Sequence, residues 1–147
     1  MPNLLRLEDL EPGDSWQTPG IVVTESHIVA FAGIGGDFFE IHMDDGYARE
    51  QGFPARVAHG LLGLTLADGL KNRAERRLDA IASLEWNVRF VAPVFAGDRL
   101  QARLTILDKR PTKDGRRGVV RLQLDLVNQH GATVQQGVNT LLVHARH

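Results

Sequence analysis

Residues 57–78 read VAHGLLGLTLADGLKNRAERRL. When this segment is wound as an α-helix, apolar residues lie around most of its circumference as far as Leu70. A helix that is apolar on nearly all sides is one that other elements cover. The segment becomes strongly polar from Lys71, which predicts that KNRAERR (71–77) is a solvated last part of the helix.

The residues after this helix have β character. Residues 122–126 alternate strictly between leucine and a polar residue, which predicts one buried and one exposed face. Turn chemistry separates the β-rich runs at 96–98, 111–118 and 129–132. The predicted strands are SLEWNVRFVAPV (83–94), DRLQARLTILDKR (98–110), GVVRLQLDLVNQ (118–129) and TVQQGVNTLLVHA (133–145). Short turns between successive strands favour an antiparallel meander.

The residues before the buried helix predict smaller elements. A loop is expected first, then a short strand at 21–23. A helix is expected to begin at 24–26 and to end at the glycines of 33–36, with another short helix at 44–53. The whole pattern is α+β: one curved antiparallel sheet wrapped around one buried central helix, in a single domain over residues 1–147.

Composition excludes several classes of protein. The chain has 147 residues, which suits one domain with one core. It has no cysteine, so thiolate catalysis and disulfides are excluded, and we expect a reducing, cytoplasmic location. A net charge of −1 offers no basic field for nucleic acid, so no nucleic-acid partner is expected. We expect neither a signal peptide nor a membrane span, because no cationic start precedes an apolar run and no apolar run has the required length.

The candidate chemistry lies in GGDFFEIHMDD (35–45). Asp37 and His42 are an acid/base candidate pair, and Phe38 and Phe39 would form an apolar slot beside them. The plainer alternatives are that the acids cap helices or sit in a turn, and that the phenylalanines belong to a core or an interface. A metal site is not expected, because the spacing of His27, His42 and His59 matches no zinc pattern.

Several separated motifs agree with one known family. The segment GDFFEIHMDDGYAREQGFPARVAHGLLGLTLADGL (36–70) resembles the hydratase motif of the MaoC-like, (R)-specific enoyl-CoA hydratases. The matching positions are Asp37, His42, Asp44, Ala48, Phe53, His59 and Gly60. ESHIVAFAGIGGD (25–37) and WNVRFVAPVFAGDRL (86–100) resemble the flanking elements, so the resemblance covers roughly residues 12–108.

The resemblance implies a hot-dog fold and a hydratase or dehydratase acting on acyl-CoA without a metal or redox cofactor. On a trans-2-enoyl-CoA, His42 and Asp37 would move the protons of water, and Gly60 would bind the oxyanion at the start of the buried helix. His59 would help to bind the substrate there or simply pack beside it. The family also implies a homodimer or a dimer of dimers, since an open sheet edge favours pairing.

Two departures from the family pattern keep other functions open. Phe39-Glu40 stands where the family often has Asn-Pro, and Asp68 stands where some relatives have serine. A hot-dog acyl-CoA thioesterase would share the helix-end donors but attack the carbonyl carbon. A non-catalytic acyl-CoA-binding subunit would keep the fold without the reaction.

Overall fold

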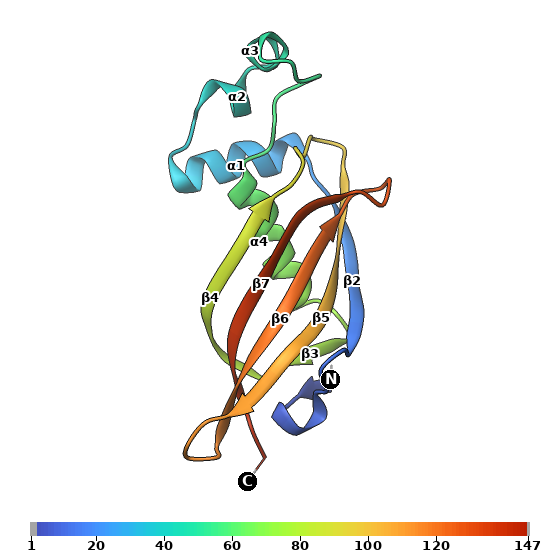
Figure 1. The fold of residues 1–147 in the computed structure, drawn as a ribbon. Coiled ribbons are helices and arrows are strands. Elements are labelled where there is room, and N and C mark those ends of the chain that lie inside the picture. The colour runs from blue at the N-terminus through green and yellow to red at the C-terminus, as the bar shows by residue number, and fades with distance from the viewer. Residues whose placement is uncertain (1–2, 147) are drawn as a thin grey trace.

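A curved antiparallel sheet wraps around one helix, as the patterning predicts (Figure 1). The computed structural model describes residues 3–146. Five strands form the sheet in the order β2-β5-β6-β7-β4, and α4 crosses its concave face. The elements are β1 Asn3–Leu5, the 3₁₀ helix η1 Leu7–Asp9, β2 Ser15–Val22, α1 Glu25–Gly35, α2 Glu40–Met43, α3 Asp45–Glu50, α4 Gly60–Lys71, β3 Arg76–Leu78, β4 Ala80–Phe90, β5 Arg99–Pro111, β6 Arg117–Val127 and β7 Thr133–His144.

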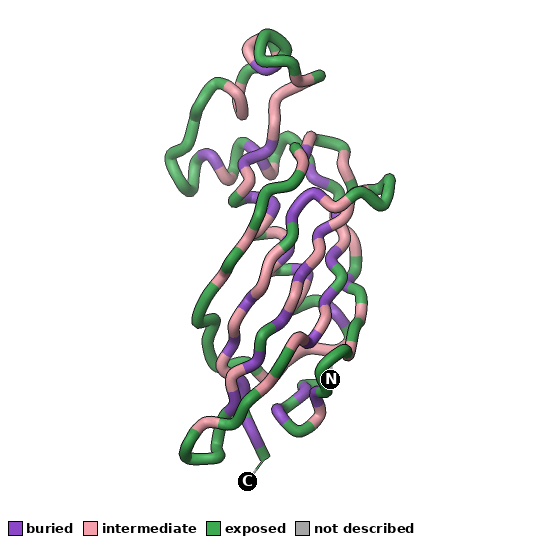
Figure 2. Tube along the Cα trace, in the orientation of Figure 1, coloured by how far each residue is buried: buried purple, intermediate pink, exposed green. Residues whose placement is uncertain are grey.

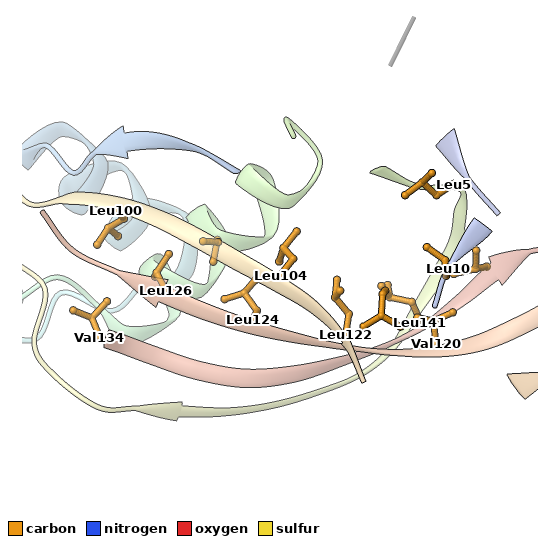
Figure 3. Close-up of a cluster of buried hydrophobic side chains, with 14 of the residues drawn as sticks. Leu5, Leu10, Leu100, Leu104, Val120, Leu122, Leu124, Leu126, Val134 and Leu141 are labelled. Atoms are coloured by element: carbon orange, nitrogen blue, oxygen red, sulfur yellow. The ribbon is translucent and has the colours of Figure 1, made fainter. Parts of the chain in front are cut away.

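The sheet buries one face of its central strands. Buried and partly exposed residues alternate along β5 and β6, and the leucines at 122, 124 and 126 all point inward, which confirms the predicted alternation. Figure 2 shows this alternation as bands along the strands, and Figure 3 shows the resulting leucine-rich layer. Burying one such leucine completely contributes about 1.5–3 kcal/mol, so this layer is the main source of stability.

Helix α4 buries one face rather than its whole circumference. Leu62 and Ala67 are buried in the same core cluster as the leucines of the sheet and Leu70 is buried as well, whereas Leu61 is 60% exposed. The prediction of a solvated helical end at 71–77 is wrong. The helix ends at Lys71, and Arg76–Leu78 is the strand β3, which pairs in parallel with β1. The backbone hydrogen bonds of that ladder replace those of a further helical turn.

The order of the strands corrects the predicted meander. Strands β5, β6 and β7 follow one another as predicted, but β4 lies beyond β7, at the edge of the sheet. Strand β4 also begins and ends earlier than predicted, at Ala80 and Phe90. Most of its residues are exposed, including Ile81 and Leu84. The turn at 96–98 therefore starts a crossing from one edge of the sheet toward the other.

Strand β2 is longer than its apolar run. Strand β2 spans Ser15–Val22, although the sequence pattern predicted only 21–23. Its pairing with β5 is interrupted between Gln17 and Gly20, where Pro19 has no N–H to donate. Thr18 repairs this interruption, because its hydroxyl accepts a hydrogen bond from the Ala102 N–H at 3.0 Å. Proline at a bulge of an edge strand is the arrangement that a sheet tolerates.

Residues 36–57 leave the body of the protein and carry α2 and α3 (Figure 1); this segment is called the excursion below. Helix α1 begins at the predicted cap, where Thr24 accepts from the His27 N–H, and it ends at Gly36, whose φ of 79° is left-handed. Helix α3 falls within the predicted 44–53, whereas α2 was not predicted.

Within residues 3–146, no helix combines the length and the apolar character that crossing a bilayer requires.

Candidate active site

An apolar cavity of about 490 Å³ lies where the start of α4 meets the ends of β4 and β7. Its wall is mostly aliphatic and aromatic, and no lysine or arginine contributes to it. The lining residues are Ile41, His42, Phe53, Val57, Ala58, His59, Gly60, Leu61, Phe90, Val91, Ala92, Pro93, Val94 and Gln135. An apolar hollow with a few polar groups is the usual form of a small-molecule site.

The histidine of α2 faces this cavity in a fixed orientation. His42 Nδ1 lies 2.6 Å from the Val57 carbonyl oxygen, so Nδ1 carries the proton and donates. The Val57 N–H in turn donates to the Ile41 carbonyl at 2.9 Å, which ties α2 to the strand-like segment before α4. Nε2 is left with its lone pair, which a base requires.

Asp37 stands opposite that nitrogen. Its Oδ2 lies 3.6 Å from His42 Nε2, and its Oδ1 accepts from the Phe39 N–H at 3.2 Å. A polar separation above 3.5 Å is one that a water molecule commonly bridges. The Asp37 side chain is 57% exposed, so it does not have the apolar surroundings expected from its two phenylalanine neighbours.

The phenylalanines of the motif do not line the cavity. Phe38 and Phe39 are 58% and 53% exposed, and Phe39 packs edge-on against Tyr47. Phe53 and Phe90 take their place in the wall. Two aromatic residues from later in the chain thus line the cavity, whereas the two phenylalanines next to Asp37 do not.

The N-terminal end of α4 faces the same cavity. The His59 carbonyl accepts from the N–H groups of Leu62 and Gly63, so the preceding amides of Gly60 and Leu61 begin the helix without intrahelical partners. These amides and the helix dipole favour negative charge. A Cβ on Gly60 would lie 2.9 Å from the Phe90 ring, so glycine is required for this close packing.

Gln135 was not predicted, although its strand contains the signal. Side chains of a strand alternate between its two faces, and Val143 and Leu141 are buried. Steps of two back along β7 reach Gln135, which therefore lies on the same buried face and is 2% exposed. Its Nε2 donates to the Gly60 carbonyl at 2.9 Å. Gly63 makes room for this amide, because a Cβ there would overlap the same nitrogen. Gln135 therefore attaches the start of α4 to the sheet.

His59 lies behind the acid/base pair. It is 4% exposed, its Nε2 lies 2.9 Å from the Asp37 carbonyl oxygen, and its ring stacks on that of His42 with centroids 3.8 Å apart. The structure thus brings Asp37 and His42 together with His59 and Gly60, which follow 17 or more residues later in the chain.

The remaining acids of the motif have local structural roles. Asp44 caps α3 by accepting from the N–H groups of Gly46 and Tyr47, as the plainer interpretation of these acids proposed. Asp45 accepts from the Arg56 N–H at 2.9 Å. The Arg56 guanidinium also pairs with Glu25 of α1 at 3.0 Å, which links the excursion to the body.

One cluster in residues 3–146 could offer three ligands to a metal ion. Atoms of Asp37, His42 and His59 lie within 4.8 Å of one another. Nδ1 of His42 and Nε2 of His59 each lie at hydrogen-bond distance from a backbone carbonyl, so each ring keeps one nitrogen as a possible ligand. The same cluster holds the carboxylate and imidazole that proton transfer requires, 3.6 Å apart.

Comparison with known proteins finds related sequences. A family model described as "MaoC like domain" matches residues 9–128. "Protein MaoC" of Klebsiella aerogenes is 43% identical over 99 residues, covering 67% of this chain and 29% of that protein. The "(R)-specific enoyl-CoA hydratase" of Rhodospirillum rubrum is 31% identical over 108 residues and 72% of each chain. This chain therefore spans less than a third of the first relative and most of the second.

Solved structures show the same fold over the whole chain. A structure of a "Monoamine oxidase regulatory protein" from Archaeoglobus superposes with a TM-score of 0.91, 28% identity, and coverage of 100% of this chain and 99% of the other. A Mycobacterium tuberculosis protein described as having a double hot-dog fold gives 0.83 with 22% identity, covering 97% of this chain and 45% of that one. The fold is a hot dog, as the sequence resemblance implied.

Proposed function

Because this chain belongs to the MaoC-like dehydratase domain family, we propose that it is a hydro-lyase that adds water reversibly to a trans-2-enoyl-CoA, giving a (R)-3-hydroxyacyl-CoA. The observation that carries the proposal is the pairing of the Asp37 carboxylate with the unprotonated Nε2 of His42 at 3.6 Å. His42 of this pair lines an apolar cavity that His59 and Gly60, at the start of α4, also line.

Asp37 and His42 move the protons of the reaction. A water molecule held between them loses one proton to the pair as its oxygen bonds to the β-carbon. The pair gives one proton to the α-carbon, so it ends in the protonation state in which it began. Since two coupled groups share this proton, they are best treated as one dyad. Proton transfer by positioned groups contributes about 10²–10⁴-fold to the rate.

The start of α4 stabilises the charge that develops on the thioester oxygen. Gly60 offers an amide without an intrahelical partner, and its lack of a side chain lets the Phe90 ring of the cavity wall pack against it. A donor that is fixed before the reaction needs no reorganisation, and losing one costs about 3 kcal/mol of transition-state stabilisation. The apolar wall around it suits the hydrocarbon part of an acyl group.

The direct test is the loss of enoyl-thioester absorbance with crotonyl-CoA, followed by longer and branched enoyl-CoAs. We expect wild type to consume the double bond, and Asp37→Asn and His42→Ala to lose about 10²–10⁴-fold in kcat while staying folded. Glu40→Gln is the matched control, since Glu40 is an exposed acid at the start of α2, three residues after Asp37. Release of free CoA would indicate thioester hydrolysis instead. Binding of acyl-CoA without turnover would indicate a binding subunit.

The proposal includes a homodimer, or a dimer of such dimers, formed at the β4 edge. Strand β4 pairs with β7 on one side, and its exposed side chains include Ile81 and Leu84. An unpaired edge with apolar side chains is a surface that natural proteins cover. Light scattering at micromolar concentration should give twice the chain mass, and Leu84→Lys should lower it. A monomeric wild type would contradict this part of the proposal.

The remaining assignments follow from the same proposal. One hydrophobic cluster runs from Leu5 to Ala145, which supports a single domain over residues 1–147. The proposed reaction needs no metal or redox cofactor, and acyl-CoA is its substrate. We assign the protein to fatty-acid metabolism in the cytoplasm, where proteins fold without disulfides, and this chain has no cysteine to form one.

A further inference from the structure

His59 contacts both members of the Asp37–His42 dyad from a buried position. We propose that His59 is a positioning residue that sets the separation of the two groups, and this inference rests on the proposed hydration reaction. Three observations carry it: the hydrogen bond of His59 to Asp37, its stacking on His42, and the nitrogen that it leaves without a partner.

The hydrogen bond determines where the His59 proton lies. Nε2 is 2.9 Å from the Asp37 carbonyl oxygen, which can only accept, so Nε2 carries the proton. Nδ1 is buried and, among residues 3–146, no group hydrogen-bonds to it. Protonating Nδ1 would bury a second N–H without an acceptor, so the ring is expected to be the neutral Nε2–H tautomer.

This hydrogen bond fixes the backbone of Asp37. Asp37 lies in the loop between α1 and α2, whose side chains are largely exposed. His59 precedes the first residue of α4, which the sheet holds through Gln135. The bond therefore connects a weakly packed loop to the most firmly packed helix. It also uses the only N–H of the neutral ring, so this N–H is not free to bind a substrate oxygen.

The stacking fixes the ring of His42. The two centroids are 3.8 Å apart at an angle of 25°, and the Phe31 ring packs edge-on against His59 at 5.1 Å. The Val57 carbonyl already holds Nδ1 of His42. A hydrogen bond at one edge and a stacked ring on one face leave little freedom for Nε2. His59 therefore controls the direction of the lone pair that faces Asp37.

Two substitutions separate these contacts. His59→Phe keeps a ring of similar size but removes both the donor and the unpartnered nitrogen, so we expect a thermal midpoint within about 4 °C of wild type. We expect kcat to fall about 10²-fold with KM nearly unchanged, because small displacements of catalytic groups act on the chemical step. His59→Gln keeps an N–H near the position of Nε2 and should recover part of the loss. His130→Phe, an exposed site in a turn, is the control.

The outcomes distinguish a positioning role from a structural one. A His59→Phe enzyme with kcat within about twofold of wild type would overturn the inference. Loss of activity that only follows loss of folding, equal in the Phe and Gln variants, would also overturn it.

A second measurement keeps the inference testable if the proposed function fails. Nitrogen-15 NMR of the imidazoles in wild type should show the proton of His59 on Nε2 and that of His42 on Nδ1, as their hydrogen bonds to backbone carbonyls require. His59→Phe should shift the signals of the Asp37 amide and the His42 ring. A His59 proton on Nδ1, or unshifted signals, would contradict the positioning role whether or not any enoyl-CoA is hydrated.

Discussion

The sheet–helix body and the excursion (residues 36–57) are held together in opposite ways. The body buries a continuous layer of leucine and valine between β5, β6, β7 and α4. The excursion has one fully buried side chain, Ala48, and is otherwise exposed or partly exposed. Figure 2 shows this difference as a change from banded strands to a mostly exposed loop.

Because of this difference, the body supplies most of the stability, and the excursion supplies the proposed proton-transfer groups. Apolar burial is non-directional and supplies most of the free energy of folding. The excursion depends on a few polar contacts, whose small net free energies nevertheless fix directions. Both proposed proton-transfer groups, Asp37 and His42, belong to the excursion, and the oxyanion donor belongs to the body. Substitutions in the two regions should therefore change different quantities.

The largest effect on stability is expected in the body. Leu104 is fully buried and pairs across the sheet with Trp16 and Leu124. Leu104→Ala should lower the free energy of unfolding by about 2–5 kcal/mol through lost burial and a cavity. Urea denaturation measures this loss, and kcat of the folded fraction should stay near wild type. Leu4→Ala, at a half-exposed position, is the control and should change stability little. A large fall in kcat for Leu104→Ala would show that the two regions are not separable.

The next effect is expected at the junction of the two regions. A Cβ on Gly63 would overlap Nε2 of Gln135 and break its hydrogen bond to the Gly60 carbonyl. Gly63→Ala should therefore destabilise the protein by about 1–3 kcal/mol and also reduce kcat, since it moves the start of α4. Gly69→Ala in the same helix has open space and should be neutral or stabilising by up to about 1 kcal/mol. Equal behaviour of the two variants in thermal melts and kinetics would contradict this reasoning.

The sequence predicted the body better than the excursion because the hydrophobic patterns of the body repeat over many residues. Alternation at 122–126 and the apolar circumference of 57–70 extend over many residues, so single exceptions do not hide them. Errors fell where pairing partners are distant in the chain. The sequence of β3 resembles a charged helix end, and only its pairing with the distant β1 makes it a strand. Strand β4 leaves the predicted meander because β2 occupies the place beside β5, and β4 pairs with β7 instead.

The candidate site was predictable in its residues and not in its contacts. The motif spacing pointed to Asp37, His42, His59 and Gly60, and the structure brings them together. Phe38 and Phe39 were expected to line the site because they follow Asp37 directly in the chain. Both are exposed, since the side chains of neighbouring loop residues need not point in the same direction. Gln135 lies 75 residues from Gly60 in the chain, so only the folded structure reveals their hydrogen bond.

A smaller effect on stability is expected within the excursion, where a substitution should change the position of the catalytic groups more than the free energy of unfolding. Arg56 joins Glu25 of α1 to Asp45 of α3, and the carboxylates are substantially exposed. Such pairs contribute up to about 1 kcal/mol, so Arg56→Ala should shift a urea midpoint only slightly. Because Val57 follows directly and holds His42, we expect a clear fall in kcat. Arg49→Ala, which loses one exposed contact to the Pro54 carbonyl, is the control. A stability loss as large as that of Leu104→Ala would place the excursion among the elements that maintain the fold.

The smallest effect is expected at the opposite end of the body, where the chain termini meet. The Arg146 N–H donates to Glu8, and this hydrogen bond lowers the pKa of the Glu8 carboxyl. The Arg6 N–H and then the Arg146 guanidinium lower the pKa of Asp9. A carboxyl group with a lowered pKa in the folded state adds stability above its ordinary pKa, and this stability is lost as pH falls through the folded value.

Because both carboxyl groups are exposed, we expect local loosening near Arg146 below about pH 4, without unfolding of the sheet. Amide NMR of Arg146 between about pH 6 and pH 2.5 follows this loosening. Glu8→Gln keeps an acceptor oxygen that does not titrate, so the Arg146 amide should lose most of its acid transition. An identical transition in wild type and Glu8→Gln would show that Asp9 alone holds the C-terminal end. Acid unfolding of the sheet in the same pH range would instead show that the body depends on charge as well as on burial, which would remove the contrast between the two regions.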